Sequence, residues 1–230
     1  MVYKTIPLTE SQVGKYVDIN GDGIPEGVIF ADLAIGGKCE YGNNADYVIP
    51  TIKEGIKDYV IIGKYDDKIN GKQEVLSPIL DGNDRFYVMA LNDLGFKKYT
   101  WYDWANYGKI DYFESATKQD FGTGRQNTLN MIDKWNNSIY GEKNINDDLW
   151  SAIQNEVKDG WFVPSRAEWT AFEMNFQINT SNYLNKGLSG RYWSSSLNNY
   201  KRAYVAQFWF GCMTHDFIYS TCSLRLVKTI

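Results

Sequence analysis

The sequence predicts an α+β fold in which antiparallel sheets are braced by two or three helices. Short extended runs between turn clusters fill the first 110 residues, for example at residues 26–34, 58–63 and 85–91. Helical periodicity then replaces them, and strand patterns return after Arg191. A chain of 230 residues can form one large domain or two small ones, and we expect one.

Three helices are expected in the middle of the chain. The third has the clearest start, because Ser165 and Glu168 form a capping box in which each side chain bonds a backbone N–H of the first turn. Apolar residues at helical spacing define the buried faces of all three helices. These residues are Leu129, Ile132, Trp135 and Ile139 in the first, Leu149, Trp150, Ile153 and Val157 in the second after the candidate N-cap Asp147, and Trp169, Phe172 and Phe176 in the third.

Strands are expected again at residues 192–196, 203–210 and 223–227. In the last of these, Leu224 and Leu226 alternate with Arg225 and Val227, which predicts a strand with two different faces. The N- and C-terminal strands are expected to meet in one antiparallel sheet.

Composition indicates a folded protein and narrows its partners. Apolar residues make up 43% and charged residues 23%, as in ordinary globular proteins. The net charge of −4 and the lack of a Lys/Arg run exclude a basic stripe for nucleic acid. No apolar stretch predicts membrane insertion, and no export signal is visible at the start of the sequence. Aromatic residues reach 16%, which suits β-rich cores and recognition surfaces.

Three motifs in the last 70 residues resemble a known superfamily. They are Trp161-Phe-Val-Pro-Ser-Arg-Ala-Glu-Trp169, Tyr192-Trp-Ser-Ser-Ser196 and Ser223-Leu-Arg-Leu-Val227. In this order they resemble a bacterial branch of the C-type-lectin-like superfamily, which holds formylglycine-generating-enzyme-like modules, Fibrobacter-type paralogous domains and the variable proteins of diversity-generating retroelements. Residues 121–150 resemble the upstream part of members from gut bacteria and their phages.

The resemblance implies a C-type-lectin-like fold for one domain spanning residues 1–230. We expect a β-rich half at 1–115, helices and a fixed scaffold at 116–196, and a variable segment at 197–230. In the retroelement proteins, mutation of template adenines diversifies positions that begin mainly as Asn codons. Tyr, Cys, His, Asp, Ser, Thr, Phe, Ile and Arg are then reachable, whereas Trp, Lys, Gln and Met are not.

The resemblance and the composition together predict a ligand-binding surface between residues 198 and 222. This segment holds the single histidine of the chain and two of its three cysteines among scattered aromatic and hydroxyl residues. Lys201, Trp209 and Met213 lie outside the codon rule, and Trp209 is expected to be a fixed aromatic anchor. Trp193, Phe208, Phe217 and Leu224 to Val227 are expected to form the buried frame. The predicted ligand contacts are Asn198, Asn199, Tyr200, Lys201, Arg202, Tyr204, Trp209, Phe210, Cys212, Thr214, His215, Asp216, Tyr219, Ser220, Thr221 and Cys222.

We therefore expect a non-enzymatic, receptor- or adhesin-type protein whose partner is a protein or glycan on a cell surface. The cell surface or a virion is the expected location, and the oligomeric state stays open. A catalytic serine among residues 194–196 is not expected, because the one histidine lies in the variable segment. The capping box likewise explains Glu168 without general-acid chemistry.

Two alternatives remain from the residues. Cys212 and Cys222 suggest the related oxidases, which use a C-terminal cysteine pair to make formylglycine, although nine residues separate the two here. Asp18-Ile-Asn-Gly-Asp-Gly23 begins like a calcium loop, but Ile29 stands where a bidentate carboxylate is needed, so we expect a plain turn and no cofactor, with weak calcium binding as the alternative. The sugar-binding motifs of calcium-dependent lectins are absent.

Overall fold

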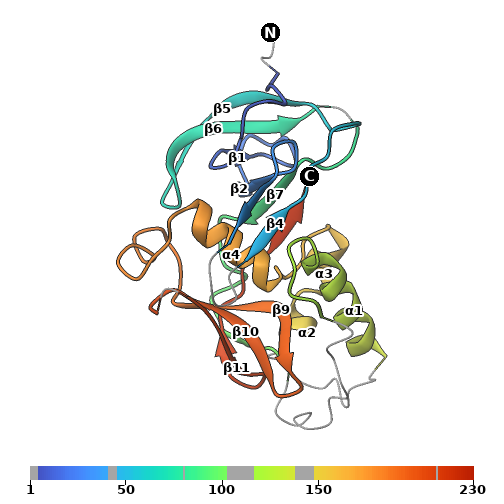
Figure 1. Cartoon of the computed structure of the whole chain (residues 1–230), viewed down its shortest axis with the longest axis vertical. Helices are drawn as coiled ribbons and strands as arrows, with labels where there is room; N and C mark the ends of the chain where they lie inside the picture. Colours follow the sequence, from blue (N-terminus) through green and yellow to red (C-terminus); the bar gives the residue numbers. More distant parts are fainter. Residues whose placement is uncertain (1–4, 41–45, 80, 103–116, 138–147, 211) are drawn as a thin grey trace.

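Two sheets dominate the structure, a computed structural model that describes residues 5–40, 46–79, 81–102, 117–137, 148–210 and 212–230 (Figure 1). A six-stranded sheet forms the upper part in this view, and a three-stranded sheet lies at the lower left. Helix α4 (Arg166–Asn175) lies between them and contacts strands of both. The coarse α+β prediction is therefore confirmed.

The six-stranded sheet joins the two ends of the chain. Its order is β13-β7-β2-β1-β6-β5, and every pair in it is antiparallel except β1 with β6, which is parallel. The expectation of purely antiparallel sheets was thus wrong, because β6 returns from its hairpin with β5 in the direction of β1. The strands are β1 (Tyr16–Val17), β2 (Gly27–Asp32), β5 (Tyr59–Asp67), β6 (Gly71–Pro78), β7 (Phe86–Ala90) and β13 (Val227–Thr229).

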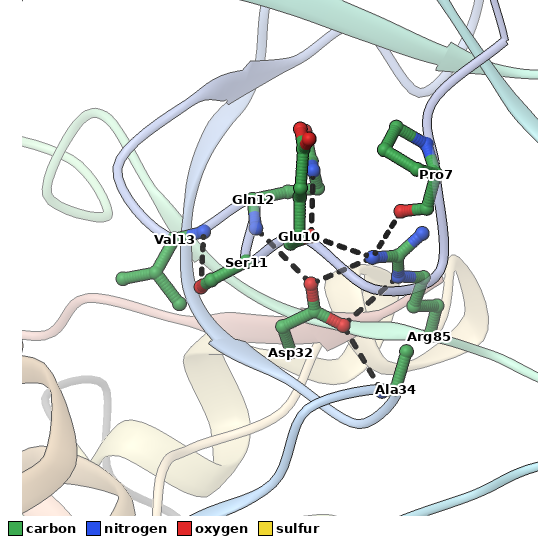
Figure 2. Close-up of polar contacts among 8 residues, drawn as sticks. All are labelled: Pro7, Glu10, Ser11, Gln12, Val13, Asp32, Ala34 and Arg85. Carbon is green, nitrogen blue, oxygen red and sulfur yellow. Dashed lines mark hydrogen bonds and ion pairs between the residues drawn. The ribbon is translucent and has the colours of Figure 1, made fainter.

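A buried ion pair fastens the N-terminal loop to this sheet (Figure 2). Arg85 Nε and Nη2 each lie 2.9 Å from an oxygen of Asp32, and both side chains are 1% exposed. Nη2 also donates to the carbonyls of Pro7 and Glu10, and the Gln12 N–H donates to Asp32. These bonds offset the cost of removing both charges from water.

The second sheet is antiparallel in the order β11-β10-β9, with β9 at Arg191–Asn199, β10 at Arg202–Gln207 and β11 at Cys212–Phe217. Two smaller sheets pair β3 (Gly37–Cys39) with β4 (Tyr47–Ile49) and β8 (Tyr99–Thr100) with β12 (Thr221–Cys222). The strand expected at 203–210 ends earlier, because residues 208–210 form the turn into β11.

The predicted strand at 223–227 was largely wrong. Only Val227 of that range belongs to a strand, β13. Leu224, Arg225, Leu226 and Val227 are all buried, so the expected alternation between two faces does not occur. Core packs on both sides of this segment, and Arg225 is buried with the carboxylate of Asp93 as its partner.

Helices lie in the three predicted regions, but the middle region holds two short helices and not every predicted face is buried. α1 (Gly124–Asn136) buries Asn127, Thr128 and Met131, whereas Leu129 is 42% exposed. The expected second helix is two short ones, α2 (Leu149–Ala152) and α3 (Gln154–Lys158), capped by Asp148 rather than Asp147. Ile139 and Asp147 lie outside the described residues. In α4 the capping box and the buried Trp169, Phe172 and Phe176 are confirmed. Within the described residues, no helix has the length and apolar character to cross a membrane.

Three indole N–H groups bond the backbone on and beside β9. Trp101 Nε1 donates to the Ser194 carbonyl at 2.8 Å, and Trp169 Nε1 donates to the Trp193 carbonyl at 3.0 Å. Trp193 Nε1 donates to the Tyr99 carbonyl at 2.7 Å. All three rings are fully buried, so β9 is fixed by Trp101 and Trp169 from two other parts of the chain and by its own Trp193.

Candidate functional site

The predicted contact residues lie on the β10–β11 hairpin and on the turns at its two ends. β10 is hydrogen-bonded on both edges, whereas β11 is an edge strand whose outer edge has no strand partner among the described residues. Residues of an edge strand can reach a ligand from either side and along the backbone.

The turn between β9 and β10 presents polar and aromatic groups. Tyr200 is 45% exposed, and the ammonium of Lys201 lies 5.0 Å from its ring centroid. Asn199 Oδ1 accepts from the Lys201 N–H at 2.9 Å, and Asn198 beside it is half-buried. The Ile218 N–H bonds the Lys201 carbonyl, so the turn after β11 lies against this one.

Trp209 and Phe210 lie at the other end of the hairpin. The six residues of β10 separate the two ends by roughly 20 Å at about 3.4 Å per residue. Trp209 is 44% and Phe210 72% exposed. A Cβ on Gly190 would overlap the Trp209 ring, so the ring packs directly on the Gly190 backbone. The anchor thus depends on a glycine that the sequence pattern did not single out.

One side of the hairpin carries an aromatic and cationic cluster, formed by Arg202, Tyr204, His215, Phe217 and Tyr219. Tyr204 lies opposite His215, with ring centroids 6.4 Å apart. The Arg202 guanidinium lies 4.5 Å from the Phe217 ring, and Arg202 Nη1 lies 3.3 Å from His215 Nδ1. Phe217 stacks on Tyr219 at 5.2 Å. Tyr204 also lies 4.6 Å from the guanidinium of Arg166, so the cluster reaches the start of α4.

The opposite side of β11 is polar. Asp216 forms an ion pair with Arg191 and accepts from the Ser220 hydroxyl at 3.0 Å. Thr214 lies on the same side as Asp216 because strand residues alternate. Thr221 beyond them is exposed. The predicted contact residues of β10 and β11 therefore lie on two opposite faces of the hairpin and do not form one continuous surface.

Two expectations within the segment need correction, and a third concerns a side chain that is not described. Phe217 was expected in the buried frame, but it is half-buried and belongs to the aromatic cluster, while the neighbouring Ile218 is fully buried. Cys222 was expected to contact a ligand, but it is 0% exposed, since β12 turns its side chain into the core. The side chain of Cys212 lies outside the described part of the structure.

The Cys222 thiol is also a poor candidate for redox chemistry. Burial raises its pKa to about 12. The thiolate is the reactive form of cysteine, so this group stays protonated near neutral pH.

The three serines of the Trp-Ser-Ser-Ser strand are fully buried and bonded. Ser194 Oγ donates to the Tyr204 carbonyl at 3.0 Å, and Ser195 Oγ accepts from Asn127 at 3.1 Å. Ser196 Oγ donates to the Lys118 carbonyl at 2.7 Å. These hydroxyls therefore bond β9 to the neighbouring strand β10, to α1 and to the loop before α1.

Glu168 holds a loop rather than facing solvent. Its carboxylate accepts from the N–H groups of Ser165, Gly122 and Gly124 at 2.7, 3.0 and 3.2 Å. A Cβ on Gly124 would overlap the Glu168 carboxylate. Burial raises the pKa of Glu168 to about 7, while the three donors act in the opposite direction. The backbone of Gly122-Thr123-Gly124, at the start of α1, is thus hydrogen-bonded to the capping box of α4.

The calcium-like loop forms a series of turns stabilised by its own side chains. Asp18 accepts from the N–H groups of Gly21 and Gly23 at 2.7 and 2.8 Å, and Asp22 accepts from Ile24. Asn20 accepts from the Asp22 N–H. Across the residues that the structure describes, no group of three or more His, Cys, Asp or Glu side chains is placed to hold a metal.

Compared with known proteins, the chain matches no family model, no curated protein and no solved structure.

Proposed function

We propose that this chain is a non-enzymatic ligand-binding protein of the receptor or adhesin type, which displays diversified residues on a fixed frame of C-type-lectin-like character. Its partner is a protein or a glycan on a cell surface. The surface of the β10–β11 hairpin and its turns makes the contact.

The accessibility of the assigned contact positions carries the proposal. The positions assigned as variable contacts on the codon rule, other than the two cysteines, are all half-buried or exposed, whereas Phe208 and Ile218, which the rule also reaches, are buried. The expected frame residues Trp193, Phe208 and Leu224 are 0% exposed. The assignment of contacts and frame used no structural information, so their different burial supports it. The exceptions are Cys222, which is buried, and Phe217, which is more exposed than expected.

The chemistry of the hairpin supports recognition. Exposed aromatic rings supply large contact area at a low entropic cost, and neighbouring polar groups adapt to different partners. Trp209 and Phe210 are adjacent, exposed apolar groups, and soluble surfaces tend to avoid such groups in clusters.

A library experiment tests the proposal. Residues 198–200, 202, 214–216 and 219–221 are randomised with adenine-directed codons, and the chain is displayed on yeast. We expect most members to remain folded, as measured by protease resistance, and selection against a panel of purified surface proteins and glycans to yield members with distinct specificities.

A matched library that randomises the buried residues 192–197 is the control, and we expect it to lose folded members. Equal loss of folding in both libraries, or folded hairpin variants with no selectable binding, would contradict the proposal. Sequencing the DNA beside the gene tests the retroelement origin: the absence of both a near-copy repeat differing at adenines and a reverse transcriptase would remove that part.

The two other functions make different predictions. A calcium-dependent lectin would release its ligand in chelator, and an oxidase would lose turnover when Cys222 becomes Ser. The burial of Cys222 does not favour the oxidase, and the hydrogen bonds within the loop at 18–23 do not favour the calcium-dependent lectin.

A further inference from the structure

A cavity of about 730 Å³ lies away from the hairpin and is lined by none of the predicted contact residues. Four separate parts of the chain form its walls: residues 67–68 at the end of β5, residues 91–98 after β7, residues 186–189 before β9 and residues 223–225 after β12. Small-molecule sites typically have volumes of about 300–1,000 Å³, so this cavity is large enough for a sugar.

The cavity collects positive charge in a chain whose net charge is −4. Lys68, Lys97 and Lys98 are exposed around it. Lys186 lies at the wall, where its ammonium donates to the Ile69 carbonyl at 2.9 Å. A concave site lined by one sign of charge concentrates the field and attracts counter-ions from solution.

The buried wall is built around Arg225 and Asp93. Arg225 is 2% exposed in its side chain, and its Nε donates to Asp93 Oδ1 at 2.7 Å. Asp93 also accepts from the hydroxyls of Tyr192 and Ser189, at 2.9 and 2.8 Å. The carboxylate is therefore both paired and hydrogen-bonded, which leaves it little capacity to offset the lysines around it.

One donor of this wall is unused. Arg225 Nη1 is buried without a hydrogen-bond partner in the described structure, whereas Nη2 donates to the Gly187 carbonyl at 3.0 Å. Asp67 is the other carboxylate of the wall, and its Oδ1 accepts from the Ile69 N–H. The cavity thus has a fixed polar wall and an excess of cations at its mouth.

The remaining lining groups suit a sugar ring. Phe96 is fully exposed, with nothing covering its ring. Such a ring can stack on the apolar face of a sugar. Ser189, Ser223 and Asn92 supply hydroxyl and amide groups that can bond sugar hydroxyls.

We propose that this cavity binds an acidic sugar, that is, a sugar ring bearing a carboxylate or a phosphate. The acid group lies among the lysines, and the ring packs on Phe96. This site is separate from the hairpin surface, so one molecule of the protein would hold two ligands.

Isothermal titration calorimetry of the full chain tests the proposal with four probes. Glucuronic acid and glucose 6-phosphate carry both features, glucose lacks the charge, and inorganic phosphate lacks the ring. We expect both acidic sugars to bind about tenfold more tightly than either comparison probe, and their affinity to fall as salt is raised, because exposed charges are screened. Equal affinity for glucose, equal affinity for phosphate, or no heat with any probe would overturn the proposal.

Variants at exposed positions avoid a failure to fold. The double variant Lys68→Ala with Lys98→Ala should weaken both acidic sugars by roughly tenfold, since it removes two exposed charges that attract the acid group. Phe96→Ala should weaken the acidic sugars and leave the weak phosphate response unchanged. Lys53→Ala, at an exposed lysine outside the cavity, is the matched control and should change nothing. Unchanged sugar affinity in the double variant and in Phe96→Ala would sink the assignment.

Discussion

Strands β9 and β11 lie on either side of β10, but they are stabilised in opposite ways. In β9, residues 192–197 are all buried, and backbone and hydroxyl groups of the strand bond side chains from distant parts of the chain. In β11, the described side chains are half-buried or exposed. Met213 packs against the core, and the others contact the hairpin, the turn after it and Arg191 of β9. Buried long-range bonds fix β9, whereas the contacts of β11 are partly or fully open to solvent.

The largest expected effect comes from removing the buried Trp193 ring of β9. Trp193→Ala leaves a cavity in a fully buried site and removes the bond to the Tyr99 carbonyl, so it should destabilise the fold by about 3–5 kcal/mol. Trp209→Ala is the matched control, and because Trp209 is 44% exposed it should cost about 1 kcal/mol. Urea unfolding measures both, and similar losses in the two variants would contradict the comparison.

The second effect concerns the pH dependence contributed by Glu168. A carboxyl with a raised pKa binds its proton more tightly in the folded chain, so protonation favours folding. This stabilisation is complete below pH 4.5 and is lost as pH rises through about 7. Between pH 5 and pH 8 the loss should be about 2–3 kcal/mol relative to Glu168→Gln, which cannot titrate. The readout is the difference in unfolding free energy between the two proteins at each pH. A difference that does not change with pH would contradict a raised pKa of Glu168 in the folded protein.

A smaller effect is expected at the hydroxyl that links β9 to its support. Ser196 Oγ donates to the Lys118 carbonyl and accepts from the Arg166 N–H at 3.0 Å. Ser196→Ala removes both bonds at the fully buried Ser196 and should cost about 1–2 kcal/mol. Ser220→Ala, which loses one bond to Asp216 at the edge of β11, should cost less than about 0.5 kcal/mol. Thermal melting compares the pair, and a larger loss at Ser220 would reverse the interpretation of the two strands.

The smallest effect is expected within β11 itself. Thr214→Ala and His215→Ala should each change stability by no more than about 0.5 kcal/mol, because these side chains are partly or fully open to solvent. Chemical denaturation checks this limit. A loss comparable to that of Ser196→Ala would mean that β11 belongs to the fixed frame.

Much of the local structure could be predicted because it depends on neighbouring residues. The capping box of Ser165 and Glu168 needs only a spacing of three residues, and the stripe Trp169, Phe172 and Phe176 needs only the helical period. Both are present as predicted. Phe208 and Trp193 were correctly assigned to the core, because large aromatic residues next to strand patterns are seldom left exposed.

The failures involve residues whose environment is set by distant segments. Leu129 fits the helical period of α1 but faces solvent, because α1 packs through Thr128 and Met131 instead. Cys222 and Leu224 to Val227 lie in a segment covered on both sides, which no alternation of residues could indicate. The cavity of Arg225, Phe96 and the lysines is built from four parts of the chain, and so it has no motif in the sequence.

The sequence by itself therefore determined the α+β class, the capped start of α4 and the division of the C-terminal segment into reachable and unreachable residues. These follow from spacing, period and codon chemistry, which act over a few residues. Only the tertiary structure decided that the predicted contacts lie at two separate ends and on two opposite faces of the hairpin. It also decided that Cys222 is buried and that the lysines surround the cavity wall formed by Arg225. Those features depend on which distant segments pack together, and the free energy of that packing is not a property of any local pattern.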